Sequence, residues 1–169
     1  SYTETAVQDF IPINLRLGTA IGTEFDDYNK MSFAFDINKL LVPTPPVYNN
    51  EGEITIGQDP NVSVVSGVFQ SFGDAPGGFS EEIREINYSI GTEYWYANQF
   101  ALRAGYFFEH STKGGRKFLT FGSGVKYSAF TLDFSYLVNA NNDAGATNPL
   151  ANTMRFSLTW DFGAMEEAN

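Results

Sequence analysis

The sequence contains no cysteine, so disulfide bonds and cysteine-based zinc sites are excluded. Basic residues are scarce as well, because ten Lys and Arg face 20 Asp and Glu, which gives a formal net charge of −10 at pH 7. Nucleic-acid-binding proteins carry the opposite surplus, so we expect no nucleic-acid partner. No apolar run approaches the roughly 18 residues that a membrane-spanning helix needs, which excludes helical spans but leaves β-strand spans open.

Aromatic residues are abundant by contrast. Phe, Tyr and Trp make up 16% of the 169 residues, whereas charged residues make up only 18%, below the usual figure of about 25%. The length is sufficient for one domain. The composition is therefore rich in aromatic residues and poor in charge for a water-soluble protein.

Alternation of apolar and polar residues predicts β-strands along most of the chain. In the first segment Ile13, Leu15 and Leu17 occupy one face, while Asn14 and Arg16 occupy the other. Charged residues within these segments fall on the polar face. The predicted strands span residues 13–25, 30–38, 85–96, 100–109, 118–127, 130–138 and 153–162. The sequence therefore predicts an all-β fold.

The connections between these strands alternate between short and long. The short ones cover residues 26–29, 97–99 and 128–129, and the long ones cover residues 39–84, 110–117 and 139–152. Alternate connections of an antiparallel meander lie at the same end of the sheet, so all short turns fall on one side and all long loops on the other. This is the layout of an outer-membrane β-barrel with long extracellular loops.

A water-soluble β-sandwich or lipocalin-like barrel alternates in the same way, with its apolar face turned inward. Three features favour the transmembrane barrel: strands of about ten residues, long loops on one side, and aromatic residues that end the last strand, Trp160 and Phe162. The polar face is rich in Gly, Ala and Ser with charges of both signs, as suits a crowded lumen. Aromatic residues near the short turns predict an interfacial girdle, formed by Tyr28, Tyr94, Tyr96, Phe100, Tyr127, Phe130, Trp160 and Phe162.

Seven antiparallel strands cannot close a barrel, because bacterial single-chain barrels have an even number of strands. An open edge in lipid would leave backbone groups unpaired, each at a cost of several kcal/mol. If the C-terminus is periplasmic, residues 1–12 end an extracellular loop whose preceding strand is absent from this chain. We therefore expect the chain to form the C-terminal half of a single larger barrel domain.

Five motifs carry a resemblance to a known family. They are residues 10–18 (FIPINLRLG), 25–30 (FDDYNK), 39–46 (KLLVPTPP), 103–107 (RAGYF) and 155–159 (RFSLT). Over nearly its whole length the chain resembles the C-terminal half of the PorV family, the FadL-like outer-membrane barrels of the type IX secretion system. The resemblance implies a 14-stranded barrel in the outer membrane of a Gram-negative bacterium, with seven strands here.

The resemblance also implies a carrier role without catalysis or a cofactor. A protein of this kind binds the C-terminal signal domain of secreted cargo at the translocon and delivers the cargo to the cell-surface attachment complex. The expected partners are the translocon pore protein, the cargo signal domain, the attachment complex with its sortase-like protease, and outer-membrane lipid. The main alternative is a FadL-type channel for uptake of hydrophobic small molecules, which shares the fold.

The connection at residues 39–84 is the leading candidate for partner contact, because loops beyond roughly 12 to 15 residues are usually functional or disordered. It begins with a stiff proline-rich segment and then offers Asp59, Pro60 and Asn61 as a helix cap. Helical spacing of Val62, Val65, Val68, Phe69 and Phe72 predicts a short amphipathic helix that ends near Gly73. The candidate partner-binding residues are Pro43, Pro45, Pro46, Val65, Phe69 and Phe72. A helix that folds back to cap its own lumen is the alternative.

Catalytic, metal-binding and nucleotide-binding patterns have little support. The only histidine, His110, follows Glu109 and precedes Ser111, and adjacent residues at a strand end rarely converge as a nucleophile and a base. These residues also lack the spacing of metal ligands. The glycine pairs at 77–78 and 114–115 lack the strand-to-helix context of a phosphate-binding loop. We therefore predict no enzymatic activity, no metal and no cofactor.

Overall fold

The computed structural model describes residues 12–140 and 152–162. Three sequence predictions fall partly or wholly outside the described residues. They are the extracellular segment at residues 1–12, the long connection at 139–152, and the periplasmic C-terminus.

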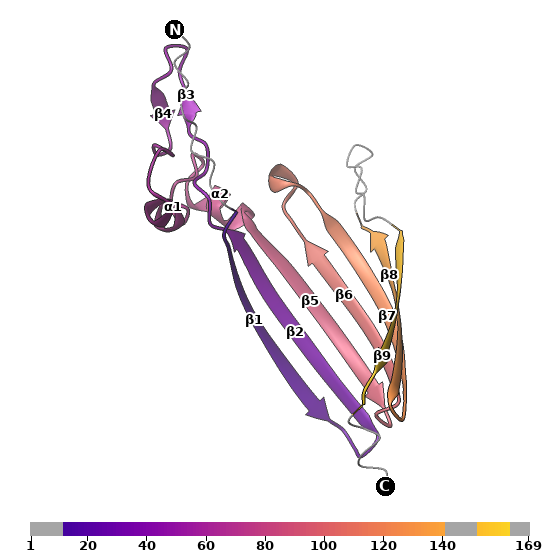
Figure 1. Cartoon of the computed structure of the whole chain (residues 1–169). Coiled ribbons are helices and arrows are strands. Elements are labelled where there is room, and N and C mark those ends of the chain that lie inside the picture. Colours follow the sequence, from indigo (N-terminus) through magenta and orange to yellow (C-terminus); the bar gives the residue numbers. More distant parts are fainter. Residues whose placement is uncertain (1–11, 141–151, 163–169) are drawn as a thin grey trace. The chain divides into compact units, whose positions relative to one another are not determined.

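A seven-stranded sheet dominates the structure, with its strands side by side in chain order (Figure 1). The strands are β1 (Asn14–Glu24), β2 (Asn29–Leu40), β5 (Ile86–Tyr96), β6 (Phe100–Phe108), β7 (Lys117–Tyr127), β8 (Phe130–Asn139) and β9 (Thr153–Trp160). The seven strands that the alternation predicts are all present, and no end differs by more than two residues. The all-β prediction and the meander order are confirmed, while the described sheet is not closed.

The register between strands shows why alternation in the sequence becomes two chemically different faces. Neighbours from β5 to β9 pair antiparallel, so Val125, Leu132 and Leu158 stand in one row across three strands. Asp133 and Ser157 form the adjacent row. Because successive side chains point to opposite sides of a strand, one row belongs to the apolar face and the next to the polar face.

The apolar face of this sheet is the exposed one. Leu102 is 61% exposed and Phe156 is 70% exposed. On the opposite face Ala101 is only 2% exposed, and Phe118 is 8% exposed and stacks on Phe107 with ring centroids 5.6 Å apart. A water-soluble sandwich buries its apolar face instead, so this sheet presents a large apolar surface that a non-aqueous environment or another protein must cover.

Tight turns join three pairs of strands. Ala97, Asn98 and Ser128 adopt positive φ angles of 53°, 54° and 51°, the left-handed conformation that short hairpin turns require. In the first turn the Asp26 carboxylate accepts hydrogen bonds of 2.8 Å from the backbone N–H groups of Tyr28 and Asn29. Each turn reverses the chain within a few residues, as the short connections predict.

Aromatic side chains gather at this turn end of the sheet. The Phe130 and Trp160 rings lie 4.6 Å apart, and Phe162 stacks on Trp160 at 5.4 Å. Tyr28 and Tyr96 lie 6.5 Å apart across two turns. The clustering agrees with the aromatic belt that the sequence predicts, and its location at a membrane surface stays a prediction.

The long connection between β2 and β5 contains regular structure. Its elements are the hairpin β3 (Val47–Tyr48) and β4 (Ile54–Ile56), and the helices α1 (Val64–Gln70) and α2 (Phe79–Arg84). The predicted helix is present as α1, but the helix is capped by Ser63, whose hydroxyl accepts from the Ser66 N–H. Asp59 instead closes a local turn by accepting from the Asn61 N–H. The prediction of a cap at residues 59–61 is therefore wrong, and the helix ends at Gln70 rather than near Gly73.

The chain divides into two compact units. One unit contains residues 1–16 and 38–87 and is called the loop unit here; the other contains residues 17–37 and 88–169 and is called the sheet unit. None of the helices within residues 12–140 and 152–162 is long and apolar enough to cross a membrane.

Candidate functional site

The interior of the loop unit is polar and is organised around one lysine. The Lys39 ammonium donates to Glu82 at 2.9 Å and to Glu85 at 2.7 Å, and the three side chains are only 8%, 9% and 13% exposed. Glu85 also accepts from the Thr44 hydroxyl at 3.0 Å, and Glu82 accepts from the Ala75 N–H at 2.9 Å. These bonds connect the end of β2, the proline-rich segment and α2.

Asp74 is a carboxylate of this interior that has no cation beside it among residues 12–140 and 152–162. It is 1% exposed, and its Oδ2 accepts from the Thr44 N–H at 2.8 Å, whereas its Oδ1 has no hydrogen-bond partner within the same described ranges. Burial raises the pKa of Asp74 above its ordinary value, and the charges of Glu82 and Glu85 add to the shift, against the hydrogen bonds from Thr44. Asp74 therefore keeps its proton to a higher pH in the folded loop unit than in the unfolded chain.

The contribution of Asp74 to the stability of the loop unit decreases as the pH rises. The unfolded Asp74 has its ordinary pKa, and the folded state holds the proton to higher pH. Stability is therefore fully present at low pH and falls as the pH rises through the folded pKa. We expect D74N to abolish this fall, measured as the pH dependence of hydrogen-exchange protection at the Thr44 and Ala75 amides. The control D59N changes an exposed carboxylate, and an unchanged pH profile in D74N would contradict the prediction.

Large apolar side chains lie on the surface of the loop unit around α1. On α1, Gly67 is buried, and Ser71, which caps the end of this helix, is fully buried. The predicted contact residues Val65, Phe69 and Phe72 are 68%, 73% and 50% exposed. The structure therefore leaves the three apolar side chains of this predicted set uncovered.

The proline-rich segment divides between interior and surface. Pro43 and Pro46 are buried, whereas Pro45 is exposed. Gly57, with φ of 100°, lies so close to Pro46 that an added Cβ would stand 3.0 Å from the proline ring. Pro43 and Pro46 are thus part of the interior of the loop unit, whereas Pro45 is open to solvent. Partner binding by all six residues stays a prediction.

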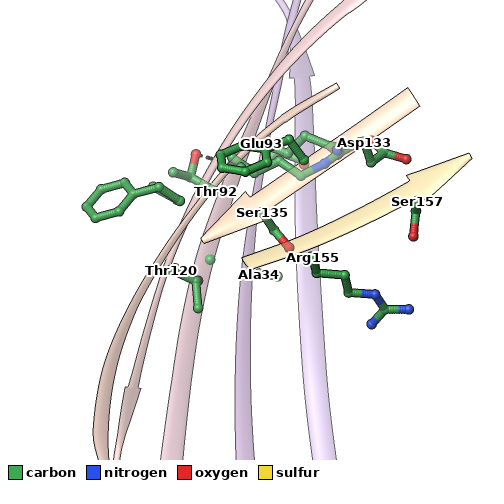
Figure 2. A pocket seen from close by; sticks show the side chains of 16 residues that line it. Ala34, Thr92, Glu93, Thr120, Asp133, Ser135, Arg155 and Ser157 are labelled. Carbon is green, nitrogen blue, oxygen red and sulfur yellow. Dashed lines mark hydrogen bonds and ion pairs between the residues drawn. The ribbon is translucent and has the colours of Figure 1, made fainter. Parts of the chain in front are cut away.

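The polar face of the sheet unit carries a second candidate, a hollow of about 490 Å³. Residues from β2 and from β5 through β9 line it, including Thr92, Thr120, Ser135, Arg155 and Ser157 (Figure 2). A hollow bounded by six strands of one sheet means that the sheet curves around its polar face. The interpretation of this face as a lumen is in keeping with that curvature.

An arginine crosses the floor of this hollow. Arg103 on β6 donates to Glu93 on β5 at 2.5 Å and, across the whole of β7, to Asp133 on β8 at 2.6 Å. It can pass over β7 because Gly124 stands there, where an added Cβ would lie 2.6 Å from Asp133 Oδ1. The Arg103 guanidinium also lies 5.5 Å from the centre of the Trp95 ring, which explains why this aromatic residue occupies the polar face.

The segment around His110 is a structural turn. Glu109, which is 3% exposed, accepts from Arg116 Nε at 2.7 Å and from Arg116 Nη2 at 2.8 Å. Burial opposes ionisation, but the hydrogen bonds from Arg116 outweigh it and hold the pKa of Glu109 below its ordinary value. His110 caps the short helix η1 (Ser111–Lys113). Within the part of the chain that the structure describes, no group of three or more acidic, His or Cys residues has metal-binding geometry.

Neither α2 nor the buried charge cluster of the loop unit is among the features predicted from the sequence. One signal was present: Phe79 and Ile83 stand four residues apart, directly after Gly77 and Gly78, and Glu81 and Glu82 fall in the first turn. A helix of six residues is too short to show a longer apolar periodicity in the sequence. The pairing of Lys39 with Glu82 and Glu85 left no local pattern, because it joins residues 43 and 46 positions apart.

Comparison with known proteins finds a family that part of the chain matches. Residues 1–47 match the sequence model of a family described as type IX secretion system protein PorV. The matched segment includes β1, β2 and the proline-rich segment, and it contains three of the five motifs on which the resemblance rests. No curated protein matches the chain. The similarity supports a role in type IX secretion and is consistent with an outer-membrane protein of a Gram-negative bacterium.

Proposed function

We propose that this chain belongs to a non-enzymatic outer-membrane carrier of the type IX secretion system. The observation that carries the proposal is the similarity of residues 1–47 to the PorV family. The carrier binds the C-terminal signal domain of secreted cargo at the translocon pore protein. It then delivers the cargo to the surface attachment complex that contains a sortase-like protease.

The outward apolar face of the sheet supports a location in lipid. β1 and β9 stand at the two ends of the strand order, so further strands are needed to close the sheet. We place the seven strands in the C-terminal half of a FadL-like barrel of 14 strands. The long connections face the cell exterior and the C-terminus faces the periplasm. The alternative is an uptake channel for hydrophobic small molecules.

The exposed surface around α1 is the contact that the proposal assigns to the cargo. Val65, Phe69 and Phe72 together offer a large apolar area that stays uncovered within its own unit. Interfaces concentrate their binding energy in such large apolar anchors. Pro45 of the proline-rich segment is also exposed.

The test is capture of a purified cargo signal domain by the full-length protein in detergent. We expect V65S/F69S/F72S to weaken capture at least about tenfold, while the barrel assembles normally. The matched control, Y48S/I54S, removes two exposed apolar side chains from the β3–β4 hairpin and should bind like the wild type. Equal capture by the α1 variant would remove this surface from the proposal. Failure of the wild type to bind any signal domain, with co-purified fatty acid instead, would favour the uptake channel.

A further inference from the structure

The second helix of the loop unit also exposes apolar side chains. On α2, Phe79 is 80% exposed and Ile83 is 43% exposed, and they lie four residues apart on one face of the helix. Glu82 of the same helix is 7% exposed and is held by Lys39. The helix therefore buries a charged side chain while it leaves two apolar side chains in contact with solvent, which has no benefit in water.

Hydrogen bonds connect α2 to the segment that follows α1. Glu82 on α2 accepts from the Ala75 N–H, and the Gly78 N–H donates to the Ala75 carbonyl, which fixes the start of α2 against the segment that follows α1. Gln58 donates to the Gly73 carbonyl in the same segment. The exposed apolar residues of α1 and α2 thus belong to a common scaffold that the polar interior holds in place.

The charge of the loop unit indicates whether lipid or a protein partner contacts the exposed apolar residues of α1 and α2. Residues 38–87 contain seven acidic residues and two basic ones. Lys39 pairs with Glu82 and Glu85, and Asp74 is buried, so the remaining charges are Glu51, Glu53, Asp59 and Glu81 against Arg84. Helices that lie on membrane surfaces carry Lys and Arg around their apolar face. α1 has no charged residue, and α2 has two acidic residues in its first turn and one arginine in its last. This balance opposes adsorption to anionic lipid and complements a basic protein surface.

We propose that Phe79 and Ile83 of α2, with the apolar residues of α1, bind the cargo signal domain through an apolar face flanked by Lys and Arg. This inference rests on the proposed function and specifies the partner chemistry at that site. The apolar contacts supply the affinity, and the acidic surplus of the loop unit selects cargo faces with positive charge and accelerates their encounter.

The test uses the full-length protein in detergent, with a purified cargo signal domain as the probe and biolayer interferometry as the readout. We expect F79S/I83S to raise Kd at least about tenfold, as expected for loss of two anchor residues. The control V47S/I56S removes a similarly exposed apolar pair from the β3–β4 hairpin and should leave Kd within about threefold of the wild type. Unchanged heat-modifiable migration of each variant on gels shows that its barrel is folded.

Charge is tested separately by two substitutions at the same exposed position. F79K and F79E remove the same ring, so a basic partner face should make F79K bind more weakly than F79E. Wild-type affinity should also fall as salt rises from about 50 to about 500 mM, because screening weakens attraction between opposite charges. Equal Kd for F79K and F79E, or for F79S/I83S and the wild type, overturns the inference and leaves the proposed function intact. A wild type that binds no signal domain overturns the proposed function itself.

Discussion

Substitution of Leu158 by arginine should cost about 2 to 4 kcal/mol of folding free energy if this position lies near the bilayer midplane, because a lipid-facing charge is expensive there. Leu158 is 72% exposed on the apolar face and stands beside Leu132 in the register. L132R, one strand away, should behave in the same way. The measurement is reversible unfolding of the full-length protein in lipid vesicles.

The matched control is S157R, next to Leu158 on the same strand and therefore at nearly the same depth. Ser157 points to the polar face, lines the hollow and stands opposite Asp133 in the register. An arginine there meets a carboxylate and water instead of lipid, so we expect a change of about 0.5 kcal/mol or less. If S157R costs as much as L158R, the assignment of the apolar face to lipid is wrong.

The sheet could be predicted from the sequence because its signal is local and repeated. Alternation in 118–127 and 130–138, with two residues between them, fixes both strands and the faces of Val125 and Leu132. An antiparallel meander in chain order was the premise of the prediction, and the lengths of the connections then placed the short turns at one end of the sheet. Closure of the barrel lies outside the described sheet and rests on physical argument about unpaired strand edges.

The charges could be assigned to a face but not to partners. Arg103 was placed on the polar face by parity, yet its bond to Asp133 depends on the absence of a side chain at Gly124, on the strand between them. A glycine in a strand has several possible meanings, and only the register shows which applies. The ion pairs inside the loop unit could not be predicted for the same reason, because their partners are far apart in the sequence.

The predicted contact helix shows a different limit. Helical spacing correctly placed Val65 and Phe69 on one face of α1, but an apolar stripe ordinarily marks the side that packs inward. Here the buried side is formed by Gly67 and Ser71. Sequence periodicity finds the stripe and cannot say which way it points, because the direction depends on what else the unit can bury.

Replacement of Lys39 by methionine should have the largest effect on the loop unit. Methionine keeps most of the side-chain length, but it leaves the carboxylates of Glu82 and Glu85 buried without their cation. Loss of one member of a buried charge cluster typically costs about 3 to 5 kcal/mol. We expect this loss in the free energy of local opening, measured by hydrogen exchange at amides of α2 in the full-length protein.

The control is K30M, which removes a lysine from an exposed pair with Glu24. Those two side chains are 36% and 69% exposed at a distance of 2.9 Å, so solvent screening limits the expected cost to about 0 to 1 kcal/mol. The triple variant K39M/E82Q/E85Q should recover part of the loss, since neutral amides need no cation and can still accept the bonds from Thr44 and Ala75. Equal protection in K39M and K30M would show that the buried cluster does not hold the loop unit together. In that case, contacts other than the Lys39 cluster keep the apolar side chains of α1 and α2 exposed.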